Sequence, residues 1–271
     1  MGSDAFREAK LSCRINHPDL LLPQNRRAGF WGIIRSNMNI SIIPNFITLA
    51  NLSAGALATL CLLYGRLEAA IWLVGASVIA DFLDGAVARR LNAHSALGKQ
   101  LDSLADMVAF GVVPGILMYG LIAVSWNDGQ WPGDIFMPAL PGLLLTIFAA
   151  LRLGKFNIDE RQGTGFIGLP TPACTILVAG LLLIFNSHEA AWAQFLFKPW
   201  MLYGITALLC WLMVAEIPML ALKFSNFGWV GNEIKYIFAF VSVALSIVFR
   251  EAAPVLIIFV YAAFSLVLYS P

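Results

Sequence analysis

Charged residues are scarce in this sequence. Asp, Glu, Lys and Arg together make up 12% of the 271 residues, whereas hydrophobic residues make up 59%. The formal net charge is only +1, so the chain lacks the strongly basic surface with which proteins bind nucleic acids. A composition so poor in charge is typical of an integral membrane protein and not of a soluble domain with a large core.

Cysteine and histidine are also scarce, and neither occurs at the spacing of a metal site. The four cysteines form no C-x-x-C pair, and the three histidines are scattered along the chain. This pattern argues against a disulfide framework, a thiolate metal site and a histidine metal site. We interpret the cysteines as small hydrophobic side chains.

The first 37 residues are polar and basic and contain no apolar run of membrane length. They do not show the charged, apolar and cleavage-site regions of a signal peptide. Two interpretations stay open. Residues 1–37 are a natural segment that lies at the membrane interface around 29–34, or Met38 is the natural start and the preceding residues are foreign to the protein.

Long apolar runs occupy the remainder of the chain. Each is near or above the ~17–25 residues that an α-helix needs to cross a bilayer, and Gly, Pro, Asn and Asp mark the breaks between them. The sequence therefore predicts an all-α, polytopic helical bundle of about eight transmembrane helices, forming one membrane domain over residues 38–271. The predicted spans are 42–65, 67–91, 97–125, 135–156, 170–187, 199–222, 234–250 and 253–270.

The basic residues give the bundle an orientation. With the N-terminus inside, only Arg66, Lys198 and Arg250 of the 17 Lys and Arg residues fall on the outer side. Because cytoplasmic loops of membrane proteins are enriched in Lys and Arg, we expect both termini in the cytoplasm. The acidic residues described next would face the same side.

Four aspartates stand at helical spacing beside the apolar runs. Asp81 and Asp84 are three residues apart, and Asp102 and Asp106 are four apart, so each pair lies on one face of its helix. Carboxylates at a bilayer are costly unless they share a cation or line a wet cavity. Since Mg²⁺ and Mn²⁺ prefer carboxylate oxygens, the spacing predicts a metal site between two membrane helices.

The residues around these aspartates extend the pattern to D-x2-D-G-x2-A-R-x8-G-x3-D-x3-D, from Asp81 to Asp106. This pattern resembles the signature of the CDP-alcohol phosphotransferases. The resemblance implies that Asp81, Asp84 and Asp102 bind divalent cations, either Mg²⁺ or Mn²⁺. Two such ions are expected. It also implies that Asp106 binds metal and takes the proton from the acceptor hydroxyl.

The same resemblance implies a site for the CDP-linked lipid. Gly85 and Ala88 would admit the cytidine, Arg89 would pair with a phosphate, and Gly98 would leave room for the ligand. The polar residues that open the first apolar run have two interpretations: they border the nucleotide pocket, or they hold neighbouring helices together. They are Asn45, Thr48 and Asn51.

A second segment points to the acceptor. The run from Leu151 to Asn157, followed by the Gly-Leu-Pro-x-Pro stretch that ends at Pro172, resembles the phosphatidylserine synthase branch of the family. That branch tends to carry Ala-Arg where this chain has Gly154-Lys155, a change that keeps the charge but loses bidentate geometry. The resemblance implies that Arg152, Lys155 and Asn157 hold a serine carboxylate; the alternative is an ordinary basic helix end.

The resemblance thus implies a phosphatidyl transfer from CDP-diacylglycerol to L-serine, with release of CMP, in the cytoplasmic membrane of a microbe. The protein is expected to contact membrane lipids and to form a homodimer. A sibling transferase that uses glycerol phosphate, inositol phosphate or another alcohol is the first alternative, although phosphorylated acceptors should require a denser cationic pocket. A divalent-cation transporter is the second, but the sequence shows no two-fold internal repeat.

Overall fold

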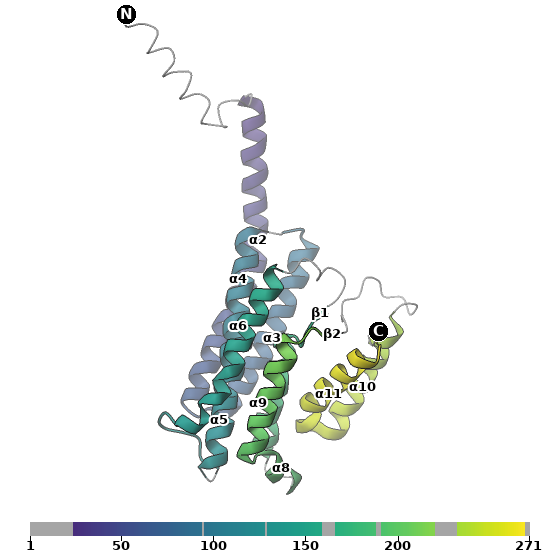
Figure 1. Cartoon of the computed structure of the whole chain (residues 1–271). Coiled ribbons are helices and arrows are strands. Elements are labelled where there is room, and N and C mark those ends of the chain that lie inside the picture. The colour runs from purple at the N-terminus through teal and green to yellow at the C-terminus, as the bar shows by residue number, and fades with distance from the viewer. Residues whose placement is uncertain are drawn as a thin grey trace, which may run out of the picture.

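The structure, a computed structural model, describes residues 24–93, 95–127, 129–158, 166–187, 191–219 and 232–268. These residues form an almost entirely helical molecule (Figure 1). The α-helices are α2 (Gln24–Leu63), α3 (Leu67–Arg90), α4 (Ala96–Met107), α5 (Val113–Trp126), α6 (Leu144–Ile158), α7 (Thr171–Ser187), α8 (Ala191–Leu196), α9 (Pro199–Val214), α10 (Glu233–Phe249) and α11 (Ala253–Leu268). Two short strands are β1 (Phe166–Ile167) and β2 (Pro218–Met219).

The predicted all-α, polytopic membrane architecture is confirmed. Within the described part of the chain, five helical stretches are long and apolar enough to cross a bilayer, and α7 and α9 are shorter apolar helices. The first span, Ile42–Leu63, is the second half of α2, whose first half projects past the other helices (Figure 1). The predicted boundary between residues 37 and 38 therefore falls inside a continuous helix.

The last apolar stretch, Glu233–Leu266, is divided at Arg250. Arg250 has a φ of 41°, a backbone conformation that ends α10. Helix α11 then packs against α10 and α7, and the rings of Phe238 and Tyr261 meet edge to face with centroids 6.0 Å apart. Two helices thus occupy this stretch, as the separate predicted spans 234–250 and 253–270 require.

The sixth predicted span, 199–222, is too long. Helix α9 ends at Val214 because Ala215 is extended, and β2 then pairs antiparallel with β1. Gly168 follows β1 with a φ of 74°, and a Cβ there would lie 2.7 Å from the carbonyl oxygen of Met213. A glycine is therefore needed where the chain turns past the end of α9 into α7.

Helices α5 and α7 form the centre of the bundle, where most side chains are buried. A π-helical turn, Val108–Val112, joins α4 to α5, and Pro114 follows it. Because proline has no N–H, the carbonyl of Phe110 lacks its usual donor four residues along. The Thr175 hydroxyl of α7 lies 3.4 Å from this carbonyl, and its shorter contact, 3.0 Å, is to the Thr171 carbonyl. The Thr146 hydroxyl of α6 donates to the next carbonyl, that of Gly111, at 2.9 Å. These contacts place α6 and α7 against the π-helical turn that follows α4, which carries two of the aspartates.

The outer surfaces of α3 and of residues 42–63 of α2 are apolar. Phe46, Trp72 and Phe82 are among the large hydrophobic side chains exposed there. A surface of this kind is suited to lipid and not to water. The polar residues of both helices that are buried, such as Thr48 and Asp84, lie on the inner side.

Candidate active site

The connection between α3 and α4 places the two aspartate pairs at matching depths. Asn92 has a φ of 49°, a conformation that asparagine tolerates and that ends α3. Ser95 then begins α4 by accepting a hydrogen bond from the Gly98 N–H at 2.9 Å. Only a short turn separates the two helices, so residues equally far from the turn lie at similar heights.

Asp81 stands nine residues before the end of α3, and Asp106 stands ten residues after the start of α4. At a rise of 1.5 Å per residue, both lie about 14–15 Å from their helix ends. Both carboxylates thus lie between two and three helical turns from the α3–α4 turn, and Asp106 stands just before the π-helical turn that follows α4. Asp84 and Asp102, each six residues from the turn, form the next level.

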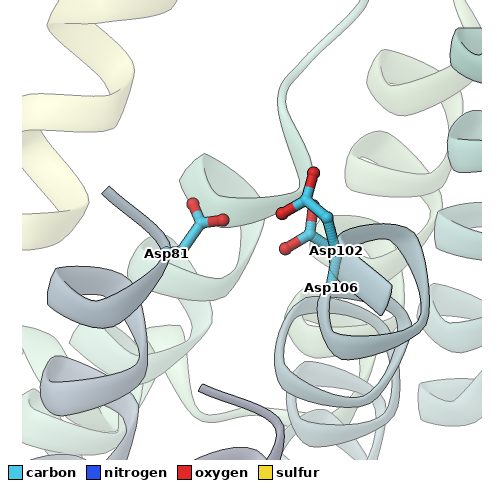
Figure 2. Close-up of side chains that lie close together, drawn as sticks. All are labelled: Asp81, Asp102 and Asp106. Carbon is cyan, nitrogen blue, oxygen red and sulfur yellow. The ribbon is translucent and has the colours of Figure 1, made fainter. Parts of the chain in front are cut away.

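Three of the carboxylates converge. One oxygen from each of Asp81, Asp102 and Asp106 lies within 4.8 Å of the others. Figure 2 shows Asp81 reaching from one helix toward Asp102 and Asp106 on another. Three of the four aspartates that the sequence assigns to one site thus lie close together.

The fourth carboxylate, that of Asp84, is turned toward α2. The Thr48 hydroxyl donates to its Oδ2 at 2.7 Å, and also lies 3.0 Å from the carbonyl oxygen of Pro44. A hydroxyl carries one proton, and the shorter contact is the one to the carboxylate. Thr48 and Asp84 are 4% and 5% exposed, so α2 orients one acidic side chain of the site.

These residues line a cavity of about 770 Å³ between α2, α3, α4, α6 and the beginning of α7. The cavity brings together nearly all of the site residues expected from the sequence. They are Asn45, Thr48, Asp81, Asp84, Gly85, Ala88, Arg89, Gly98, Asp102, Asp106 and Arg152.

The exceptions are Asn51, Lys155 and Asn157, which do not line this cavity. Asn51 is fully buried and its side-chain oxygen accepts a short hydrogen bond from Ser77 of α3. Its position matches the interhelical alternative for the polar residues of α2. Lys155 and Asn157 are both exposed, and the Asn157 side chain is hydrogen-bonded to the Ser103 hydroxyl of α4.

Two glycines leave space at the mouth of the cavity. A Cβ at position 98 would lie 2.9 Å from both the Asn45 Oδ1 and the Ser95 Oγ, so a side chain there would displace them. At position 85 a Cβ would lie 3.3 Å from Nη1 of Arg89, whose guanidinium folds over the glycine. Both glycines therefore allow polar groups to close on the site.

Arg152 is the basic residue on the α6 side of the cavity. It is 7% exposed, and its Nη1 donates to the hydroxyl of Thr171 at 3.3 Å. Its guanidinium lies 5.8 Å from the ring centre of Phe156, and Arg152 lines the same cavity as Asp106. A buried arginine thus stands beside the acidic cluster.

Several residues that line the cavity are not among those expected from the sequence, for example Ser95, Lys99, Phe156 and Thr171. Ser95 had a detectable signal, because serine before a helical run is a preferred N-cap. Thr171 lies inside the Pro-Thr-Pro stretch already noted. Lys99 and Phe156 carry no such signal, since their place depends on how α4 and α6 pack.

The donor set suits a hard divalent cation. Oxygens of three carboxylates converge, and the Asp106 Oδ1 is buried with no hydrogen-bond partner among the described residues. A buried carboxylate oxygen without a partner is unfavourable, and a shared cation would relieve both this cost and the repulsion between the aspartates. Carboxylate oxygens are the ligands that Mg²⁺ and Mn²⁺ prefer, so the residues fit the group that the motif implies.

Comparison with known proteins defines the class. Residues 41–248 match the family model described as CDP-alcohol phosphatidyltransferase. The chain therefore belongs to the CDP-alcohol phosphatidyltransferase family and is a membrane transferase. The family expected from the acidic motif is confirmed.

Curated relatives narrow the comparison. The CDP-diacylglycerol–serine O-phosphatidyltransferase of Bacillus subtilis (strain 168) is 36% identical over 188 residues, which cover 69% of this chain and 92% of the relative. The protein of the same name from Helicobacter pylori (strain J99) is 34% identical over 220 residues, covering 80% of this chain and 86% of the relative. An archaetidylserine synthase of Methanothermobacter thermautotrophicus is 35% identical over 144 residues, covering 52% and 58%.

Proposed function

We propose that this protein is a phosphatidylserine synthase, which transfers a phosphatidyl group from CDP-diacylglycerol to L-serine and releases CMP. The observation that carries this proposal is the acidic cluster beside buried Arg152 in one cavity. The similarity to two enzymes named for this reaction supports it.

Asp81, Asp84, Asp102 and Asp106 would hold the divalent cations, and Mg²⁺ or Mn²⁺ fits their oxygen ligands. When bound, such cations neutralise charge on the pyrophosphate of the donor. Thr48 keeps Asp84 oriented through its 2.7 Å hydrogen bond. Arg89, over Gly85 at the mouth of the cavity, would pair with a phosphate of the CDP group. Asn45 and Ala88 line the same side.

The reaction needs a deprotonated serine hydroxyl in line with the lipid-side phosphorus. Asp106 is suited to take that proton, because its Oδ1 has no hydrogen-bond partner among the described residues. The serine oxygen then forms a bond to the phosphorus, and the bond from this phosphorus to the oxygen of the CMP phosphate breaks. The proton passes to Asp106, and CMP leaves with the bonding electrons.

The cationic groups on the α6 side favour a carboxylate acceptor over a phosphorylated one. Of the two basic residues of α6, Arg152 lines the cavity, whereas Lys155 is exposed and does not. The other basic lining residues, Arg89 and Lys99, belong to α3 and α4. A single guanidinium matches one carboxylate, while a phosphate carries up to two charges and is expected to need more than one cation. This distribution supports serine against glycerol phosphate or inositol phosphate.

The location and assembly follow the same proposal. An inner-membrane position with the cavity open to the cytoplasm is supported by the placing of Lys and Arg, which puts Arg66, Lys198 and Arg250 outside. A homodimer is expected from the family resemblance and stays a prediction.

An isotope experiment tests the proposed chemistry. The purified full chain in lipid nanodiscs is given CDP-diacylglycerol, MgCl₂ or MnCl₂, and L-serine labelled with oxygen-18 in its hydroxyl. The label should appear in phosphatidylserine and not in CMP, because the serine oxygen attacks phosphorus. Label in CMP, or phosphatidylserine formation undiminished in Asp106→Asn, would contradict the proposed roles.

A further inference from the structure

Arg152 and Thr171 form a buried pair at the α6–α7 side of the cavity. The Arg152 Nη1 donates to the Thr171 Oγ1 at 3.3 Å, and Thr171 is fully buried. Both residues line the cavity. Since arginine is always charged and carries five N–H donors, a buried guanidinium needs partners or a ligand.

The guanidinium retains donors for a ligand. Its Nε is buried and has no hydrogen-bond partner among the described residues. Arg152 is more than nine-tenths buried, so water does not readily reach the Nε to accept its hydrogen bond. A negatively charged ligand group could accept the hydrogen bond from this Nε–H.

Thr171 is rigidly placed to hold this side chain. It is the first residue of α7 and stands between Pro170 and Pro172, whose rings fix the backbone on either side. Its carbonyl accepts a hydrogen bond from the Thr175 hydroxyl at 3.0 Å. The beginning of a 17-residue helix also favours negative charge nearby.

We propose that Thr171 is a positioning residue for the acceptor substrate. Its hydroxyl holds Arg152 so that the guanidinium, beside the start of α7, binds the carboxylate of a free amino acid. This inference rests on the proposed function, because it concerns the acceptor of the same reaction. Without the hydroxyl, Arg152 would keep its charge but lose its orientation, so acceptor binding would weaken while donor binding would not.

The test compares Thr171→Val, which removes the hydroxyl at nearly constant size, with Thr171→Ser, which keeps it. Thr171→Val should raise the serine KM about five- to tenfold. This is the effect expected from losing one hydrogen bond to a charged group when that bond is as long as 3.3 Å. In Thr171→Val the KM for CDP-diacylglycerol should stay within about twofold of the parent value. In Thr171→Ser the serine KM should also stay within about twofold of the parent value. Thr206→Val is the matched control, because that buried hydroxyl donates to the Leu202 carbonyl of its own helix, at 2.8 Å.

A double-mutant cycle separates positioning from general packing. If Thr171 acts through Arg152, Thr171→Val should change serine kcat/KM little once Arg152 is already alanine. An undiminished effect in that background, or equal changes in both substrate KM values, would overturn the inference. Should Thr171→Val fail to fold, Thr171→Ala in the same cycle gives the same two outcomes. Absence of serine-dependent CMP release in the parent protein would instead refute the proposed function.

Discussion

Removing the Thr48 hydroxyl is expected to weaken activation by the divalent cation about ten- to a hundredfold. Thr48 donates to the Asp84 Oδ2 at 2.7 Å, and both side chains are almost fully buried. A hydrogen bond to a charged group contributes about 1.5–3 kcal/mol, and about 1.4 kcal/mol corresponds to a factor of ten in an equilibrium constant. Without this bond, Asp84 would be free to turn away from the position in which it binds the cation.

The assay is CMP release by Thr48→Val as a function of MgCl₂ or MnCl₂ concentration. Thr48→Ser keeps the hydroxyl and should behave like the parent protein. Thr59→Val is the control on the same helix, because the Thr59 hydroxyl donates to the Gly55 carbonyl of α2 itself, at 3.1 Å. A folded Thr48→Val protein with the same half-activating metal concentration as the parent would refute the assignment of Asp84 to the metal site.

Three further changes test other parts of the site. Asp81→Asn or Asp102→Asn should lower CMP release a hundredfold or more, since each removes a charge on which the site depends; near-parent turnover in both would exclude a metal role. Arg152→Ala should raise the serine KM about ten- to a hundredfold with little effect on the CDP-diacylglycerol KM, and Arg89→Ala should do the reverse; steady-state kinetics that move both constants together would contradict the two subsites. A cysteine introduced at Gln130, in a background without native cysteines, should react with an impermeant reagent from outside the cell, whereas labelling only after permeabilisation would invert the orientation.

The acidic site was predictable because its residues follow helical spacing. Asp81 and Asp84 share a face of α3, and Asp102 and Asp106 share a face of α4, so only a short turn was needed to bring the pairs together. The apolar runs likewise defined the membrane helices, since a bilayer tolerates few other structures. The depth of Asp81 and Asp106, between two and three turns from the α3–α4 turn, became visible only with the helix ends in place.

The remaining features depend on contacts between distant segments. The local sequence does not predict the hydrogen bond between Asn51 and Ser77, because the packing of α2 on α3 determines which residues meet. The early end of α9 follows from the pairing of β2 with β1, about fifty residues away along the chain. The motif groups Lys155 with Arg152, but of these two residues only Arg152 is buried by the packing around α6.

The most direct measurement is an acceptor panel with the purified full chain. CDP-diacylglycerol and a divalent salt are held constant, and CMP release is followed with L-serine, glycerol 3-phosphate or inositol phosphate as the acceptor. Release should depend on L-serine and be at background with the two phosphorylated acceptors, because α6 contributes one buried basic residue, Arg152, to the cavity, while Arg89 and Lys99 line it from α3 and α4. Faster CMP release with a phosphorylated acceptor than with L-serine would contradict the proposal that this protein makes phosphatidylserine.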